Sequence, residues 1–264
     1  MNLTTEKIII EKEDQIGWLK LNNPDRRNAI SLSMWQAIPT VLADFEADPD
    51  IRVVVVTGVG TRAFAAGADI SEFEAVRDSA ETAAVYAEHG ERAYQALATT
   101  AKPTLAMIHG YCIGGGLAVA LSCDIRLASE RASFSIPAAR LGLGYGQRHL
   151  SKLVSIVGPA NAKEILFTAR MFSAVEAASM GLVNRVIPAN VLADYVRDYC
   201  RTIADNAPLT ISAVKTIIAE ITNPDEPIDH ALCDRLVQAC FDSQDYAEGR
   251  RAFMEKRKPV FQGR

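Results

Sequence analysis

The chain has 264 residues, and its 28 Lys and Arg against 32 Asp and Glu give a formal net charge of −4 at pH 7. This charge and the lack of a long basic run argue against a nucleic-acid-binding protein. No apolar run approaches the length of a membrane span and no signal peptide is recognisable, so we expect a cytoplasmic protein without a membrane partner. The length suits an α/β domain with a sizeable core, alone or with a helical appendage.

The cysteines do not form a pattern that points to a metal or to disulfides. There are five, and their spacing matches neither a metal-ligand motif nor a disulfide framework. An odd number also suits a reducing compartment. We therefore expect no metal site. The cysteines are Cys112, Cys123, Cys200, Cys233 and Cys240.

The first elements in chain order are a hairpin and a helix. Strands are expected at Lys7–Glu11 and Ile16–Leu21, and Ser31 is expected to cap an amphipathic helix. Pro39 lies within the helical pattern, where it removes a hydrogen-bond donor, so a kink or a break is expected there. The apolar stripe of this helix consists of Trp35, Ile38, Leu42 and Phe45.

Strands and helices then alternate, which indicates an α/β fold. A turn at 48–50 precedes a buried strand at Val53–Val56, and a longer helix is expected over Ala80–Thr99. The later strands have helices between them. These strands are expected at Thr104–Ile108, Ile125–Ala128 and Ser133–Ile136.

The last third of the chain is predominantly helical. A helix at Ala174–Met180 is expected to end at Gly181, a residue typical of the position after a helix, and to lead into a strand at Leu182–Ile187. From Val191 onward the pattern is almost entirely helical. No linker rich in Pro, Gly or Ser separates two units, so we expect the core and the helical tail to fold together.

The most informative segment is Leu105–Ile125, where an apolar strand runs into Gly114, Gly115 and Gly116, which open a helix of small residues. The free N–H groups and the dipole of a helix N-terminus favour negative charge. A second loop of small residues, Arg62–Phe73, also follows a strand. Two such loops, each giving one N–H to the same oxygen, would form an oxyanion hole for a thioester enolate. The alternative for the glycine triplet is a tight strand-to-helix turn that serves packing alone.

These two loops and four further motifs resemble the enoyl-CoA hydratase/isomerase (crotonase) superfamily, over nearly the whole chain. The resemblance implies a spiral of repeated ββα units over residues 1–190 and a C-terminal helical region over 191–264 for trimerisation and closure of the coenzyme A pocket. It also implies an acyl-CoA lyase of fatty acid metabolism, assembled as a homotrimer or hexamer, with no cofactor beyond the coenzyme A moiety of its substrate. The further motifs are NPDRRNAIS at Asn23–Ser31, FSIPAARLGLGYG at Phe134–Gly146, MGLVNRV at Met180–Val186 and FMEKRKPVF at Phe253–Phe261.

The resemblance also assigns roles to residues. It implies that the backbone N–H groups of Ala68 and Gly115 are the oxyanion donors, because these positions match the family's two loops. Guanidinium groups suit the phosphates of coenzyme A, since they donate paired hydrogen bonds. The expected coenzyme A contacts are Arg26, Arg27, Ala29, Ala66, Asp69, Ile70, Phe253 and Lys256.

The chain departs from the family's hydratases at the catalytic acids. The hydratases carry one glutamate just after the glycine triplet and another just after the proline of the F-x-x-P segment. Here these positions are Ala118 and Ala138. Alanine cannot transfer a proton, so the ordinary hydratase mechanism is absent.

Two other functions follow from this departure. A methylmalonyl- or ethylmalonyl-CoA-type decarboxylase needs no base for its first step, and Tyr145 falls where family decarboxylases carry an active-site tyrosine. Those enzymes also carry a histidine at the position of Ala68, which this chain lacks. A non-catalytic acyl-CoA binder is the other alternative. Further candidates for the cleft are His149, Glu72 and Glu74, whereas His109 is expected to be structural.

Overall fold

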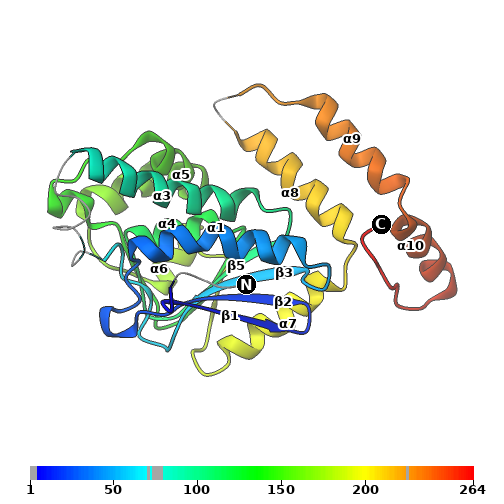
Figure 1. The fold of residues 1–264 in the computed structure, drawn as a ribbon, viewed down its shortest axis with the longest axis horizontal. Coiled ribbons are helices and arrows are strands. Elements are labelled where there is room, and N and C mark those ends of the chain that lie inside the picture. Colours follow the sequence, from blue (N-terminus) through cyan, green and yellow to red (C-terminus); the bar gives the residue numbers. More distant parts are fainter. Residues whose placement is uncertain (1–4, 70–71, 73–79, 224–225) are drawn as a thin grey trace.

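The computed structural model describes residues 5–69, 72, 80–223 and 226–264. Two sheets form the centre of the fold (Figure 1). The larger sheet has the strand order β1-β2-β3-β5-β7-β10, and the smaller has the order β4-β6-β8-β9. The larger sheet consists of β1 (Ile8–Glu13), β2 (Ile16–Leu21), β3 (Val53–Gly58), β5 (Thr104–Ile108), β7 (Ile125–Ser129) and β10 (Arg185–Ile187). The smaller consists of β4 (Ala63–Ala65), β6 (Tyr111–Ile113), β8 (Ser133–Ser135) and β9 (Phe172–Ser173).

The chain repeats one unit, in which a strand of the large sheet is followed by a strand of the small sheet and then by a helix. β3 and β4 precede α3, β5 and β6 precede α4, and β7 and β8 precede α5. Equivalent strands of successive units pair in parallel in each sheet. This arrangement confirms the predicted α/β spiral of ββα units. The helices of these units are α3 (Ala80–Thr99), α4 (Gly115–Ser122) and α5 (Gln147–Thr168).

The large sheet is covered on both faces, as expected for parallel strands. Val54 and Val56 of β3 lie in one apolar cluster with α1 (Leu32–Ala47), whereas Val53 and Val55 lie in a second cluster with α7 (Leu192–Ala204). β3 is buried throughout, which explains its continuous run of valines. The two clusters therefore fix the orientation of the strands that carry the loops of the site.

Helix α1 begins as predicted but does not break at Pro39. Ser31 caps it by accepting a hydrogen bond from the Met34 backbone N–H, and the helix then continues through Pro39 to Ala47. Of the two expected outcomes, a kink or a break, the break does not occur, and the apolar stripe is almost completely buried, each of its four side chains being 2% exposed or less. Burial of such side chains gives about 1.5–3 kcal/mol each, which outweighs the roughly 3 kcal/mol cost of a proline inside a helix.

The strand expected from Leu182 begins later, at Arg185. Helix α6 (Ala174–Ser179) ends in a Schellman motif, in which the Gly181 N–H donates to the Ala178 carbonyl and the Leu182 N–H to the Ala177 carbonyl. Leu182 therefore completes the helix end and is not available for the sheet. Gly181 has φ +77°, in agreement with the predicted helix stop.

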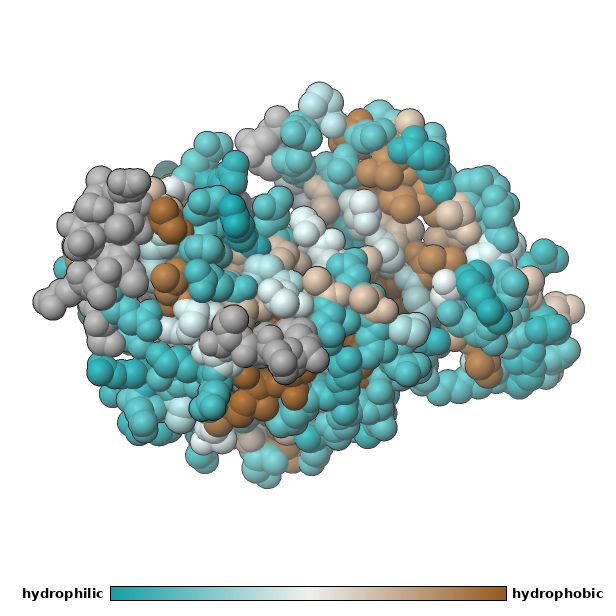
Figure 2. All heavy atoms as spheres, in the orientation of Figure 1, coloured by the Kyte–Doolittle hydropathy of each residue, from teal (hydrophilic) through white to brown (hydrophobic). Residues whose placement is uncertain are grey.

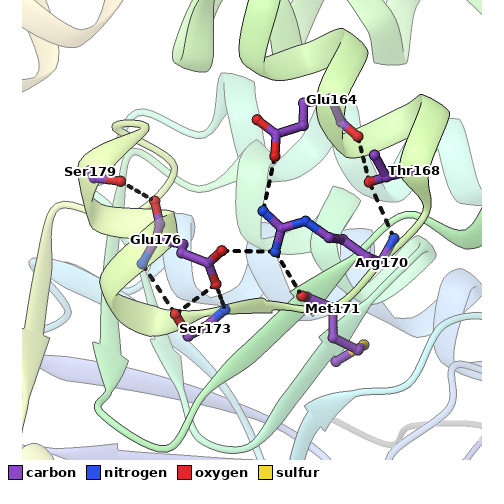
Figure 3. A network of polar contacts seen from close by, with 7 residues as sticks. All are labelled: Glu164, Thr168, Arg170, Met171, Ser173, Glu176 and Ser179. Carbon is purple, nitrogen blue, oxygen red and sulfur yellow. Dashed lines mark hydrogen bonds and ion pairs between the residues drawn. The ribbon is translucent and has the colours of Figure 1, made fainter.

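A polar network joins the end of α5 to α6 (Figure 3). Arg170 forms ion pairs with Glu164 at 2.9 Å and with Glu176 at 2.8 Å. Ser173 and Glu176 form a reciprocal capping box at the start of α6. These donors lower the pKa of Glu176 to about 2, the backbone N–H of Ser173 making the largest contribution.

The C-terminal part is helical, as predicted from Val191 onward. Its helices after α7 are α8 (Pro208–Thr222), α9 (His230–Phe241) and α10 (Gln244–Glu255), and Figure 1 shows that α9 and α10 extend away from α3 and α5. Lys215 of α8 ties this part to the core through an ion pair with Asp124 at 2.9 Å. Within the described residues, no helix is both long and apolar enough to cross a membrane.

Candidate active site

Ala68 follows β4 and is held by the segment that precedes α1. Ala68 and Ile30 form a parallel bridge, in which the Ile30 N–H donates to the Gly67 carbonyl at 2.8 Å and the Asp69 N–H donates to the Ile30 carbonyl at 3.0 Å. Successive N–H groups of an extended chain point to opposite sides. The N–H of Ala68 is therefore directed away from Ile30.

Gly115 is the first residue of α4, so its N–H has no acceptor within the helix. The preceding Gly114 has φ +51°, a conformation that favours glycine, and its own N–H donates to the Ser135 carbonyl at 2.9 Å. The absence of a side chain at Gly116 allows α4 to pack closely against β4. A Cβ at this position would lie only 2.3 Å from the Ala65 carbonyl oxygen. The glycine triplet thus sets both the turn and the close approach of the helix to the strand.

The structure brings the two predicted donor residues side by side. A Cβ built on Gly115 would lie 3.6 Å from the Ala68 backbone nitrogen, and one built on Gly114 would lie 3.9 Å from the Gly67 Cα. Both Ala68 and Gly115 are half-buried, so a ligand can reach them. The loop after β4 and the first turn of α4 therefore approach each other at the two predicted donor residues.

Aromatic side chains surround this point. Trp35 and the Tyr94 hydroxyl oxygen each lie 3.5 Å from the Cβ position of Gly115. The Tyr94 ring makes edge contacts with the rings of Trp35 and His149, both with centroids 5.2 Å apart. Tyr145 in turn lies 5.6 Å from His149. The predicted candidates Tyr145 and His149 are thus connected to the donor pair through Tyr94.

Sequence reasoning missed Tyr94 and Tyr86, which both lie on α3. The Tyr86 hydroxyl accepts a hydrogen bond from the Trp35 indole N–H at 2.9 Å and donates to the Ile30 carbonyl at 3.1 Å. Tyr86 therefore supports the same Ile30 segment that holds Ala68. Tyr86 and Tyr94 are eight residues apart, so they lie on neighbouring faces of a helix. Helical periodicity in the sequence could therefore have indicated that the two side chains point toward the same part of the fold.

The two positions of the missing glutamates lie in buried surroundings. Ala118 in α4 is 7% exposed, and Ala138 in the short 3-10 helix Pro137–Leu141 is 6% exposed. Tyr145 is half-buried, and burial raises the pKa of its phenol to about 12. This phenol therefore stays protonated at neutral pH and can act as a hydrogen-bond donor.

Of the other titratable candidates, Glu72 has a structural partner. Glu72 accepts a hydrogen bond from the Leu32 N–H at 2.9 Å, so it neutralises the N-terminus of α1. Glu74 lies outside the described residues. His109 is buried at the end of β5, and burial lowers the pKa of its imidazole, which favours the neutral form.

The predicted coenzyme A contacts near the N-terminus meet in one place. The Ala66 N–H donates to the Arg27 carbonyl at 3.0 Å. Asn23 links two further predicted contacts, Ala29 and Asp69. Its side-chain amide donates to the Ala29 carbonyl at 2.9 Å and to the Asp69 carboxylate at 3.3 Å. Arg26 and Arg27 are both exposed, while Ile70 lies outside the described residues.

Phe253 and Lys256 do not join this group within one chain. They lie on α10 and at its end, and Figure 1 places α10 at the opposite end of the molecule from α3 and α5. Phe253 is 83% exposed and lines an apolar groove of about 560 Å³ together with Phe241 and Phe261. Figure 2 shows apolar side chains gathered over α8 and α9.

The chain is similar to known proteins over almost its full length. The profile of the enoyl-CoA hydratase/isomerase family matches residues 11–264. A short-chain-enoyl-CoA hydratase from Clostridium acetobutylicum is 33% identical over 95% of each chain, and a carnitinyl-CoA dehydratase from Escherichia coli is 32% identical over 98% of this chain and 100% of its own. A solved enoyl-CoA hydratase/carnithine racemase from Magnetospirillum magneticum has a TM-score of 0.94 and 38% identity, covering 99% of this chain and 97% of its own.

Proposed function

The chain belongs to the enoyl-CoA hydratase/isomerase family, and we propose that it is a lyase that acts on an acyl-CoA thioester through an enolate. The proximity of the Ala68 nitrogen to the position of a Gly115 Cβ, 3.6 Å, carries this proposal. The two N–H groups hold the thioester oxygen as it gains negative charge. Loss of one such donor typically lowers a rate by about 10²–10³.

The dipole of α4 adds to this effect. Gly115 opens the helix, so the thioester oxygen lies at the positive end of the helix dipole. Both donors are main-chain groups fixed by neighbouring elements, Ala68 by its bridge to Ile30 and Gly115 by the packing of α4 on β4. Because they are already in place, little reorganisation is needed when charge develops.

The relatives' names include hydratases and a dehydratase, which add or remove water. Hydration needs one group that takes a proton from water and another that gives a proton to the α-carbon. Alanine at 118 and 138 can do neither. If this chain hydrates an enoyl-CoA, the proton carriers are other groups, and Tyr145 and His149 are the candidates.

The second candidate function is decarboxylation of a malonyl-type acyl-CoA, favoured by the buried Ala118 and Ala138. The bond between the α-carbon and the substrate carboxylate breaks, its electron pair forms the thioester enolate, and carbon dioxide leaves. The α-carbon then takes a proton from the Tyr145 phenol or from water. Apolar surroundings disfavour the charged substrate carboxylate, which promotes its loss.

Coenzyme A is proposed to bind where the N-terminal contacts meet. Arg26 and Arg27 are exposed and suit the phosphates. The N–H groups of Ala66 and Asp69 already donate to the Arg27 and Ile30 carbonyls, so the adenine edge would meet the carbonyl groups of this segment. In a homotrimer or hexamer, Phe253 and Lys256 would serve the coenzyme A pocket of another protomer. The distance of α10 from α3 and α5 in a single chain supports this assignment.

The test is incubation of the purified protein with enoyl-, malonyl-, methylmalonyl- and ethylmalonyl-CoA, followed by mass analysis of the products. Gain of one water by an enoyl thioester would identify a hydratase that uses unusual proton carriers. Loss of carbon dioxide would identify a decarboxylase. No product from any thioester, with tight coenzyme A binding, would contradict the proposal and identify a non-catalytic binder.

A further inference from the structure

The hydroxyl group of Tyr94 lies beside the proposed oxyanion hole. Two polar atoms are among the three nearest to a Cβ built on Gly115, namely the Tyr94 hydroxyl oxygen at 3.5 Å and the Ala68 nitrogen at 3.6 Å. We propose that the Tyr94 hydroxyl donates a third hydrogen bond to the enolate that Ala68 and Gly115 hold. This inference rests on the proposed function and adds a side-chain donor to the two main-chain donors.

The Tyr94 ring is held on two sides. The Trp35 ring meets it at 71° and the His149 ring at 90°, each with a centroid distance of 5.2 Å. Trp35 is itself buried and fixed by the hydrogen bond of its indole N–H to Tyr86. A ring confined in this way keeps its hydroxyl in one place, and such preorganised donors stabilise developing charge most effectively.

The identity of the side chain fits the charge of the intermediate. An enolate is an anion, so a neutral phenol donates to it without the repulsion that a carboxylate would add. A hydrogen bond to an ionised acceptor is roughly twice as strong as one between neutral groups. Tyr94 is half-buried, so its side chain is partly shielded from water. Alanine at 118 and 138 offers no polar hydrogen, so the Tyr94 hydroxyl beside Gly115 would supply a side-chain donor that these two positions do not.

The experiment uses acetoacetyl-CoA, a β-ketothioester that ionises to an ultraviolet-absorbing enolate without a catalytic base. The full-length protein is titrated with this thioester at a series of pH values, and the absorbance gives the ionisation constant of the bound form. Tyr94→Phe removes the hydroxyl and preserves both ring contacts. Tyr199→Phe on α7 is the matched control, because its ring packs beside Tyr195 on the other apolar cluster.

We expect the wild type and Tyr199→Phe to increase the ionisation constant of acetoacetyl-CoA above its value in free solution. Tyr94→Phe should lower the bound ionisation constant about tenfold or more. Its affinity for coenzyme A alone should stay within about twofold, which also verifies that the variant is folded. An unchanged ionisation constant in Tyr94→Phe overturns this inference and leaves the proposed function standing. No increase in the wild type overturns the proposed function, and this inference with it.

Discussion

Replacing Gly116 by alanine is expected to widen the proposed oxyanion hole without removing either donor. The new Cβ would lie 2.3 Å from the Ala65 carbonyl oxygen and 2.6 Å from the Ala65 Cβ. The clash is with backbone, so α4 must move away from β4 until these distances reach at least about 3 Å. Gly115 moves with α4, whereas Ala68 is held by its bridge to Ile30.

Gly116→Ala is expected to lower both the stability of the fold and the stabilisation of the bound enolate. Overpacking of this kind destabilises a fold by about 1–3 kcal/mol. A displacement approaching 1 Å at a catalytic group can lower a rate about 10²-fold. We therefore expect Gly116→Ala to lower the ionisation constant of bound acetoacetyl-CoA by about 10- to 100-fold, measured by the absorbance titration, and to lower the melting temperature in a thermal scan.

Gly144→Ala is the matched control, because a Cβ at Gly144 would meet nothing within 4 Å. It should bind and ionise the thioester like the wild type. If Gly116→Ala melts at a lower temperature but ionises acetoacetyl-CoA as strongly as the control, the close approach of α4 to β4 serves packing alone. That result would refute the reasoning that this contact sets the distance between the two donors.

Three further predictions concern the surroundings of the site and the fold. Tyr86→Phe leaves the buried Trp35 N–H without its acceptor, so urea denaturation should show a loss of about 1–3 kcal/mol, and no loss would contradict the hydrogen-bond chain to Ile30. Glu176 has a folded pKa of about 2, below its ordinary 4.5, so its stabilisation is present above about pH 4.5 and disappears as the pH falls toward 2. Between about pH 4.5 and pH 2, the melting temperature of Glu176→Gln should therefore fall less than that of the wild type. An equal fall would count against the network. The double variant Arg26→Ala/Arg27→Ala should weaken coenzyme A binding roughly tenfold at low salt and less at high salt in calorimetry, whereas unchanged affinity would place the phosphates elsewhere.

Local signals in the sequence were sufficient to predict most strands and helices, whereas the spiral of ββα units was implied by the resemblance to the family. The valine run of β3 indicated a buried strand, and the glycine triplet indicated a strand-to-helix turn, both of which the structure contains. Pro39 shows the limit of a local signal, because it leaves α1 unbroken. The free-energy cost of a proline inside a helix is a local property. The burial of the apolar stripe around Pro39 depends on tertiary packing, which the local pattern does not contain.

The candidate site could be predicted only where its groups belong to the main chain or to recognisable loops. The family motifs assigned Ala68 and Gly115 to one site. Helix periodicity alone does not predict which side chains Tyr86 and Tyr94 contact. Their roles depend on how α3 lies over α1 and α4, which is decided by packing between distant segments. The position of Phe253 could not be predicted for the same reason. Its sequence motif gives no indication that α10 extends away from the site in a single chain.

The central claim is that the Gly115 N–H and the Ala68 N–H hold a thioester enolate. Gly115→Pro removes one of these donors at the first position of a helix, where proline is tolerated. The most direct measurement is the ionisation constant of acetoacetyl-CoA bound to this variant, with coenzyme A affinity measured alongside. We expect the constant to fall by about 10²–10³ while coenzyme A still binds. An ionisation constant equal to that of the wild type would contradict the claim.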